Sequence, residues 1–180
     1  MHRGPFLDDA LRQFRKYRAL AEAAVAQIGP RDLFTALDAE SNSIAVVMKH
    51  LSGNMRSRWT DFLTTDGEKP DRERDGEFVV GAADTPERVR ARWDEGWALL
   101  FAALEPLGEG DLGRIVTVRG EPHTVLEAIS RQETHYAYHV GQIVLLARHI
   151  AGPRWESLSI PKGRSKDREV AKDGGPYRAK

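Results

Sequence analysis

The sequence predicts an all-α protein, an antiparallel four-helix bundle, and three observations support this fold class. Four segments repeat apolar residues at steps of three and four, the period of one face of an α-helix. Glycine, proline or capping residues bound these segments, and each is long enough to cross a small domain. The chain has 180 residues, of which 41% are hydrophobic, so one domain with one core is expected.

The first helix is predicted over residues 6–28, and Gly29–Pro30 ends it. The second is predicted over residues 39–63. The polar segment 64–77 that follows is interpreted as a solvated loop, whose charges need no functional explanation. Because the connection to the third helix is long, it is expected either to pack on the bundle or to bound a cleft. The apolar stripe of the second helix contains Ile44, Val47, Met48, Leu51, Met55, Trp59 and Phe62.

The third helix has a clear start signal. Asp84 or Thr85 caps it, and Pro86 takes the first helical position, where its missing N–H costs nothing. The helix is expected to end at Leu107–Gly108. Its apolar stripe contains Val89, Trp93, Trp97, Leu100 and Leu104.

A short extended piece is predicted at residues 115–118, before a turn at Gly120–Pro122. Thr124 and Glu127 have the spacing of a capping box and open the fourth helix, which ends at Gly152–Pro153. The bundle is therefore predicted over residues 1–163. Residues 164–180 are predicted to form a mobile, charged C-terminal tail.

Composition excludes several classes of function. Lys and Arg together number 27, as do Asp and Glu, so the formal net charge is zero and no nucleic-acid partner is expected. No apolar run approaches the roughly 20 residues that span a bilayer. The N-terminus lacks the apolar stretch of a signal peptide, so we expect a cytoplasmic protein without a membrane partner. Because the chain has no cysteine, any metal site must use His, Asp, Glu or backbone ligands.

The fourth helix carries His135 and His139 on one flank of its apolar stripe. Residues four apart face the same way, so the two imidazoles share one space. The spacing alone fits either two satisfied histidines at the edge of the core or two ligands of a metal site. His50 lies on a similar flank of the second helix and is the best candidate for a third ligand. Three imidazole nitrogens would make an open divalent site suited to zinc, nickel or copper.

Two other metal templates do not fit. A zincin needs a glutamate between its paired histidines, where this chain has Tyr136, Ala137 and Tyr138. A di-iron bundle needs a glutamate three residues before each histidine, where Gln132 and Val47 stand.

Three further residues are tentative site candidates. Asn54 lies one turn beyond His50, and Arg58 lies two turns beyond it, where it either binds an anionic substrate or is a surface residue; the surface interpretation is favoured. Gln132 precedes His135 by one turn and is either a partner of the metal ligands or a polar residue at the edge of the core. No residue is assigned as catalytic, and Glu133 lies on a different side of its helix from His135.

Residues 40–72, beginning "ESNSIAVVMKHLSGN", and residues 132–149, "QETHYAYHVGQIVLLARH", together resemble the DinB/YfiT-like superfamily. More narrowly, they resemble a bacterial branch of unknown function. The resemblance implies a four-helix bundle with a three-histidine divalent metal site. The single histidine of the family's second helix corresponds to His50, and its pair on the fourth helix corresponds to His135 and His139.

The resemblance also implies the classes of activity to consider. Such proteins include transferases and isomerases that use low-molecular-weight thiols such as mycothiol, bacillithiol or glutathione, and members often form dimers. The favoured hypothesis is therefore a homodimeric transferase or isomerase with one zinc or nickel ion, which activates such a thiol for a small-molecule substrate. The alternatives are a hydrolase that uses metal-bound water and a non-enzymatic metal-binding module of a stress response.

Overall fold

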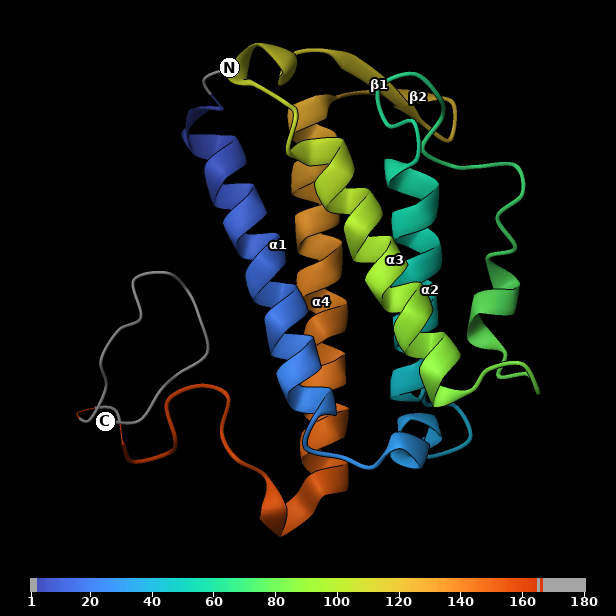
Figure 1. Ribbon diagram of the computed structural model, residues 1–180, viewed down its shortest axis with the longest axis vertical. Coiled ribbons are helices and arrows are strands. Elements are labelled where there is room, and N and C mark those ends of the chain that lie inside the picture. The colour runs from blue at the N-terminus through green and yellow to red at the C-terminus, as the bar shows by residue number, and fades with distance from the viewer. Residues whose placement is uncertain (1–2, 165, 167–180) are drawn as a thin grey trace.

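Four long helices form a bundle in the computed structural model, which describes residues 3–164 and 166 (Figure 1). They are α1 (Gly4–Val25), α2 (Ile44–Trp59), α3 (Pro86–Leu104) and α4 (Val125–Ala151). Four short 3₁₀ helices join or follow them: η1 (Pro30–Phe34), η2 (Asp75–Phe78), η3 (Glu109–Asp111) and η4 (Gly152–Arg154). The predicted all-α fold class is confirmed.

The directions of the helices do not alternate strictly along the chain. Helices α2 and α3 run the same way, as do α1 and α4, whereas α2 opposes α4 (Figure 1). Lys49 near the start of α2 accordingly binds Asp84, which lies just before α3, with 2.6 Å between Nζ and Oδ2. The connection over residues 60–85, hereafter the crossover, carries the chain back along the bundle, and this return makes α2 and α3 parallel.

The ends of the helices follow their local signals. The Thr85 side chain accepts a hydrogen bond from Arg88 N and caps α3, and the predicted capping box of Thr124 and Glu127 opens α4. Helix α2 is shorter than the predicted 39–63 at both ends, because Ser43 caps its start and Thr60 has an extended backbone that ends it.

The extended piece is one half of a β-hairpin. Strand β1 (Ile115–Val118) pairs antiparallel with β2 (Glu121–Thr124), which was not predicted, because its residues were assigned to a turn. The turn consists of Arg119 and Gly120, both with positive φ, as a two-residue hairpin turn of type I′ requires.

The core lies along the contact of all four helices and is rich in aromatic rings. Phe14 of α1, Trp59 of α2, Trp97 of α3 and Tyr136 of α4 pack with ring centroids 5.7–6.4 Å apart. Such a cluster fixes the rotation of each helix about its own axis, because each ring fills space between the others.

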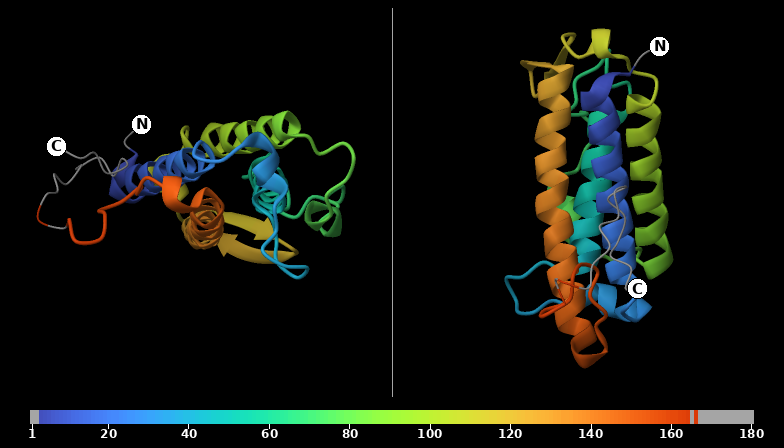
Figure 2. Two further views of the ribbon diagram at one scale, coloured as in Figure 1. Left: turned by 90° about the horizontal axis from the view of Figure 1, so that it is seen from below. Right: turned by 90° about the vertical axis from the view of Figure 1, so that its left-hand side faces the viewer.

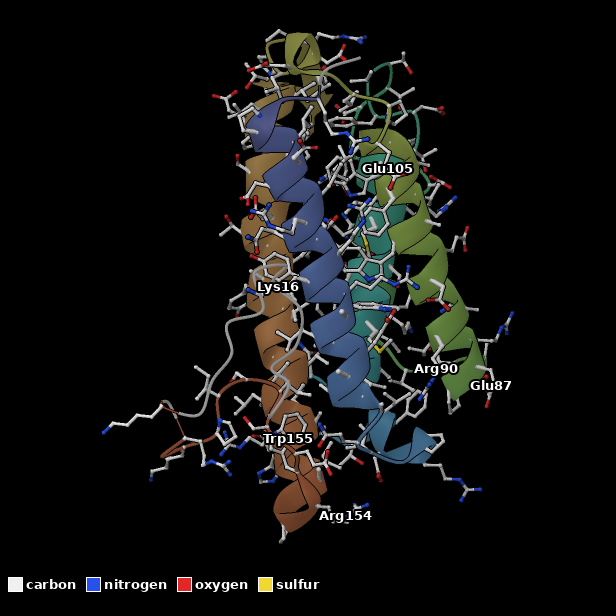
Figure 3. The ribbon with its side chains drawn as sticks, turned by 60° about the vertical axis from the view of Figure 1, so that its left-hand side comes forward. Lys16, Glu87, Arg90, Glu105, Arg154 and Trp155 are labelled. Carbon is white, nitrogen blue, oxygen red and sulfur yellow. The ribbon has the colours of Figure 1, made fainter. Side chains whose placement is uncertain are left out.

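The chain after α4 turns back onto the lower end of the bundle. Trp155 packs against the core, and its position beside the lower part of α4 is seen in Figure 3. The Gln27 side chain exchanges two hydrogen bonds with the Glu156 backbone, which fastens this segment near the end of α1. Apart from residues 164 and 166, the predicted mobile tail lies outside the described residues, and its mobility stays a prediction.

Candidate metal centre

The structure brings His50, His135 and His139 together between α2 and α4. One nitrogen of each ring lies within 4.8 Å of the other two, and His50 Nε2 is 3.3 Å from His135 Nε2. We call these three residues the imidazole cluster. Seen along the bundle, α2 lies between α4 and η2 (Figure 2). His50 accordingly contacts His135 of α4 through Nε2 and Glu77 of the crossover through Nδ1. The predicted convergence of the three imidazoles is confirmed.

His50 has its outer nitrogen fixed by the crossover. Its Nδ1 lies 2.9 Å from Glu77 Oε2, and because a carboxylate only accepts, Nδ1 carries the hydrogen and donates it. The Nε2 lone pair therefore points toward the cluster. The ring of Phe78, the next residue, packs against the imidazole with centroids 5.0 Å apart.

His139 is oriented in a similar way from its own helix. Its Nδ1 is 2.8 Å from Gln142 Oε1, an amide oxygen that accepts the hydrogen bond. The Nε2 lone pair of His139 is thus also free for a ligand. Metal-bound histidines usually donate their second N–H to such an acceptor, which fixes the tautomer and the ring orientation.

The spacing of His50 and His135 matches a shared metal ion. Two nitrogens bound tetrahedrally at about 2.0–2.1 Å from one ion lie about 3.3–3.4 Å apart. Without metal, His135 Nε2–H donates to His50 Nε2 across the same 3.3 Å. For His135 Nε2 to bind a divalent ion, its hydrogen would move to Nδ1 of the same ring, and the third nitrogen, within 4.8 Å, would complete the set.

The surroundings of His135 and His139 favour the neutral form of both rings. Burial lowers the pKa of His135 to about 3, and the nearby His139, His50, Arg58 and Arg72 reinforce this effect. Burial also lowers the pKa of His139, although its bond to Gln142 opposes the change. Neutral imidazole is the form that binds metal, and at neutral pH His135 carries one ring hydrogen and keeps one nitrogen lone pair.

Glu77 is an ionised acceptor despite its burial. Burial raises its pKa, but hydrogen bonds from His50 and Arg72 outweigh burial and hold the pKa below its ordinary value. Arg72 binds both carboxylate oxygens, through Nε to Oε1 at 2.8 Å and Nη2 to Oε2 at 2.9 Å.

The three tentative residues lie near the cluster, and none has a hydrogen bond to its rings within the described part of the chain. Asn54 is buried, and its Oδ1 accepts from the Tyr136 hydroxyl at 2.9 Å. Gln132 is buried beside Arg58 and lines a small cavity with it. A role in substrate binding or in support of the metal ligands stays a prediction for all three.

Arg58 is not a surface residue, and that interpretation was wrong. It is 5% exposed and donates to the Gly67 carbonyl and, at 3.0 Å, to Glu68 Oε2. The guanidinium is held by the crossover, which folds over this part of α2.

The interpretation of residues 64–77 as a solvated loop is also wrong. Arg72 and Glu77 are buried there, and Glu77 binds a histidine of the cluster. The sequence gives no signal for this contact, because Glu77 is one charge in a charged run and the run has no periodicity. Gln142 was missed as well, although its position three residues after His139 places it on the same helical face.

No described helix has the length and apolar character that a membrane span requires.

Fold and site together define a class: a helical-bundle protein whose second and fourth helices form a three-histidine group that could hold a metal ion. The chain belongs to the family described as "Protein of unknown function (DUF1572)", whose model matches residues 2–164. Comparison with curated proteins and with solved structures finds no match. The family description assigns no activity, so a function must be argued from the site itself.

Proposed function

We propose that the protein binds one divalent metal ion through His50, His135 and His139. The observation that carries this proposal is the 3.3 Å between His50 Nε2 and His135 Nε2, together with an Nδ1–H of His50 that is turned away toward Glu77. Three neutral nitrogen ligands leave at least one position open for a substrate, as in catalytic metal sites. We expect zinc or nickel, two of the ions that suit an all-imidazole set.

The reaction that we propose is a transfer or isomerisation that uses a low-molecular-weight thiol. A bound divalent ion lowers the pKa of a coordinated thiol and so supplies a thiolate at neutral pH. The chain has no cysteine, so the thiol would come from solution. The rings of Phe78 and Tyr138 lie against His50 and His139 and are partly exposed, which gives a small substrate apolar surface beside the site.

Hydrolysis by metal-bound water needs a general base, and two carboxylates near the cluster, Glu77 and Glu133, do not fit that role. This favours the thiol-dependent reaction over hydrolysis. Glu77 is engaged by Arg72 and His50 and has little capacity to accept another proton. Glu133 lies near Tyr17 of α1, whose pKa is raised by burial and further by the charge of Glu133. Neither carboxylate is therefore placed to serve as a general base toward the open side of the cluster.

Metal content tests the ion-binding part of the proposal. Elemental analysis of purified protein should find one zinc or nickel ion per chain, and His135→Ala should lose it. His123→Ala is the matched control, because His123 lies on β2 outside the cluster and this variant should keep the metal. Full retention of metal by His135→Ala would contradict the site.

Assays with and without thiol then test the reaction. Turnover of electrophiles that depends on added mycothiol, bacillithiol or glutathione supports the proposal. Hydrolysis of esters or amides without thiol would point to the hydrolase instead. A metal that stabilises the fold, without turnover in either assay, would point to a non-enzymatic module.

A further inference from the structure

Glu77 reaches His50 only because helix α2 has a gap in its surface at Gly53. A Cβ at this position would lie 2.1 Å from Glu77 Oε1 and 2.7 Å from Glu77 Cδ, far inside contact distance. Gly53 follows His50 by three residues, so both lie on the face of α2 that η2 covers. Any other residue at position 53 would push the carboxylate off this face.

Arg72 completes the positioning of the carboxylate from the crossover. Its guanidinium binds both oxygens of Glu77, while Oε2 also accepts from His50 Nδ1. Arg72 is itself held by Glu68, through Nη1 and Oε1 at 3.3 Å. The Glu77 carboxylate is therefore fixed on three sides, by the guanidinium, the imidazole and the glycine surface.

We infer that Gly53 and Arg72 are positioning residues for the metal centre, acting through Glu77. They place the carboxylate so that His50 keeps its hydrogen on Nδ1 and presents the Nε2 lone pair to the ion. The acceptor also raises the basicity of the imidazole and puts a negative charge behind a ligand set that has none. This inference rests on the proposed metal-binding function.

A simple ion pair between Arg72 and Glu77 does not account for the glycine. An ion pair between these two residues alone would not require the carboxylate to touch α2. Glycine inside a helix costs stability relative to alanine, so its presence at the point of closest approach is best explained by the contact that it allows.

Zinc affinity, measured by competition with a chromophoric chelator, tests the inference through a double-mutant cycle. Gly53→Ala should weaken zinc binding about 10–100-fold, the usual effect of losing an acceptor behind a ligand, and Glu77→Ala should do the same. The double variant should bind zinc no more weakly than the single variant with the lower zinc affinity. In the double variant, the alanine at position 53 has no carboxylate left to displace.

Two controls accompany the cycle. Gly141→Ala on α4 also adds a methyl group to a helix, but nothing lies within 4 Å of it, so zinc affinity should not change. Glu73→Gln removes a negative charge from an exposed position of the same crossover and should have little effect. Far-UV circular dichroism checks that each variant is helical.

The tautomer of His50 in the metal-free protein gives a second readout, which a purely structural ion pair would not move. At about pH 8, where a free imidazole is neutral, ¹⁵N shifts of the wild type should report hydrogen on Nδ1 alone. Gly53→Ala should show a mixture of tautomers, and Gly141→Ala should match the wild type.

The outcomes separate the inference from the proposed function. Zinc affinity and a His50 tautomer in Gly53→Ala equal to those in Gly141→Ala would overturn the inference, even if both proteins bind zinc tightly. A wild type that binds no divalent metal would overturn the proposed function, while the tautomer comparison would still test the contact itself.

Discussion

At the scale of single residues, one hydroxyl joins the two helices that carry the imidazole cluster. Trp59 Nε1 donates to the Tyr136 hydroxyl at 2.9 Å, and this hydroxyl donates to Asn54 Oδ1 at 2.9 Å. All three groups are buried, so each depends on the others for its hydrogen bond. Burial also raises the pKa of Tyr136 above its ordinary value, so the hydroxyl keeps its proton and can donate.

Removing that hydroxyl should destabilise the bundle without removing metal. Tyr136→Phe leaves the Trp59 N–H and the Asn54 oxygen buried and unpaired, which we expect to cost about 1–3 kcal/mol of unfolding free energy. Denaturant unfolding measures the loss, and Tyr138→Phe is the control, because Tyr138 is 64% exposed. Equal stability of the two variants would argue against a hydrogen-bonded role for Tyr136.

At the scale of elements, the crossover is attached to the bundle at both ends of its polar segment. Near its start, Asp66 accepts hydrogen bonds from the backbone N–H groups of Arg119 and Gly120 at 2.9 and 2.8 Å, so the turn of the hairpin is fastened to it. Near its end, Glu77 and Phe78 contact His50. The crossover therefore contacts the hairpin through Asp66 and contacts α2 through Glu77 and Phe78.

Acid should loosen the hairpin from the crossover. Burial raises the pKa of Asp66, but the backbone hydrogen bonds outweigh it and leave the pKa below its ordinary value. The folded protein thus binds this proton less readily than the unfolded chain. The stabilisation is present above the unfolded pKa of about 3.9 and is lost as pH falls through the lower, folded pKa.

Hydrogen exchange of the Arg119 and Gly120 amides against pH checks this expectation. Protection of these amides should fall in the wild type below about pH 4. Asp66→Asn should already show the weaker protection at neutral pH and little further change in acid. Flat protection across this range in the wild type would contradict the role of the carboxylate.

The contact between α2 and α3 depends on a second close approach. A Cβ at Gly96 would lie 3.0 Å from Met55 Cε and 3.3 Å from Ser52 Cα, and the latter is backbone that cannot move alone. Gly96→Ala should therefore lower the unfolding free energy by about 1–3 kcal/mol, the usual cost of overpacking. Gly141→Ala, with open space around it, should stabilise α4 by up to about 1 kcal/mol, and a loss there would contradict this explanation.

At the scale of the whole molecule, the imidazole cluster joins two helices that lie far apart in the sequence. His50 lies on α2, and 85 residues separate it from His135 on α4. An ion that binds only the folded arrangement must stabilise it by mass action. Metal binding and global stability are therefore coupled in the proposed function.

Zinc should raise the melting temperature, and a chelator should reverse the rise. At free zinc about 100 times the Kd, the expected stabilisation is about 2.7 kcal/mol. His139→Ala should lose most of this increase, whereas His123→Ala should keep it. Differential scanning calorimetry measures the shift, and an equal increase in His139→Ala would place the zinc elsewhere.

Much of the fold and the centre of the site could be predicted from local patterns. The steps of three and four residues predict α1, α3 and α4 within a few residues, and the capping signals at Thr85 and Thr124 place two helix starts. The spacing of His135 and His139 puts both rings on one face without any tertiary information. Strand β2 was missed because Gly120 and Pro122 are turn signals, and only pairing with β1 makes its residues a strand.

The sequence by itself determined which segments are helical, which faces they bury, and that two histidines of α4 point one way. Only the tertiary structure decided that α2 and α3 run parallel, that Arg58 is buried, and that Glu77 lies on His50. The reason is physical: helical periodicity is repeated every turn and can be read locally. The contact of Glu77 with His50 instead joins residues 27 positions apart and depends on a single glycine that leaves room for one carboxylate.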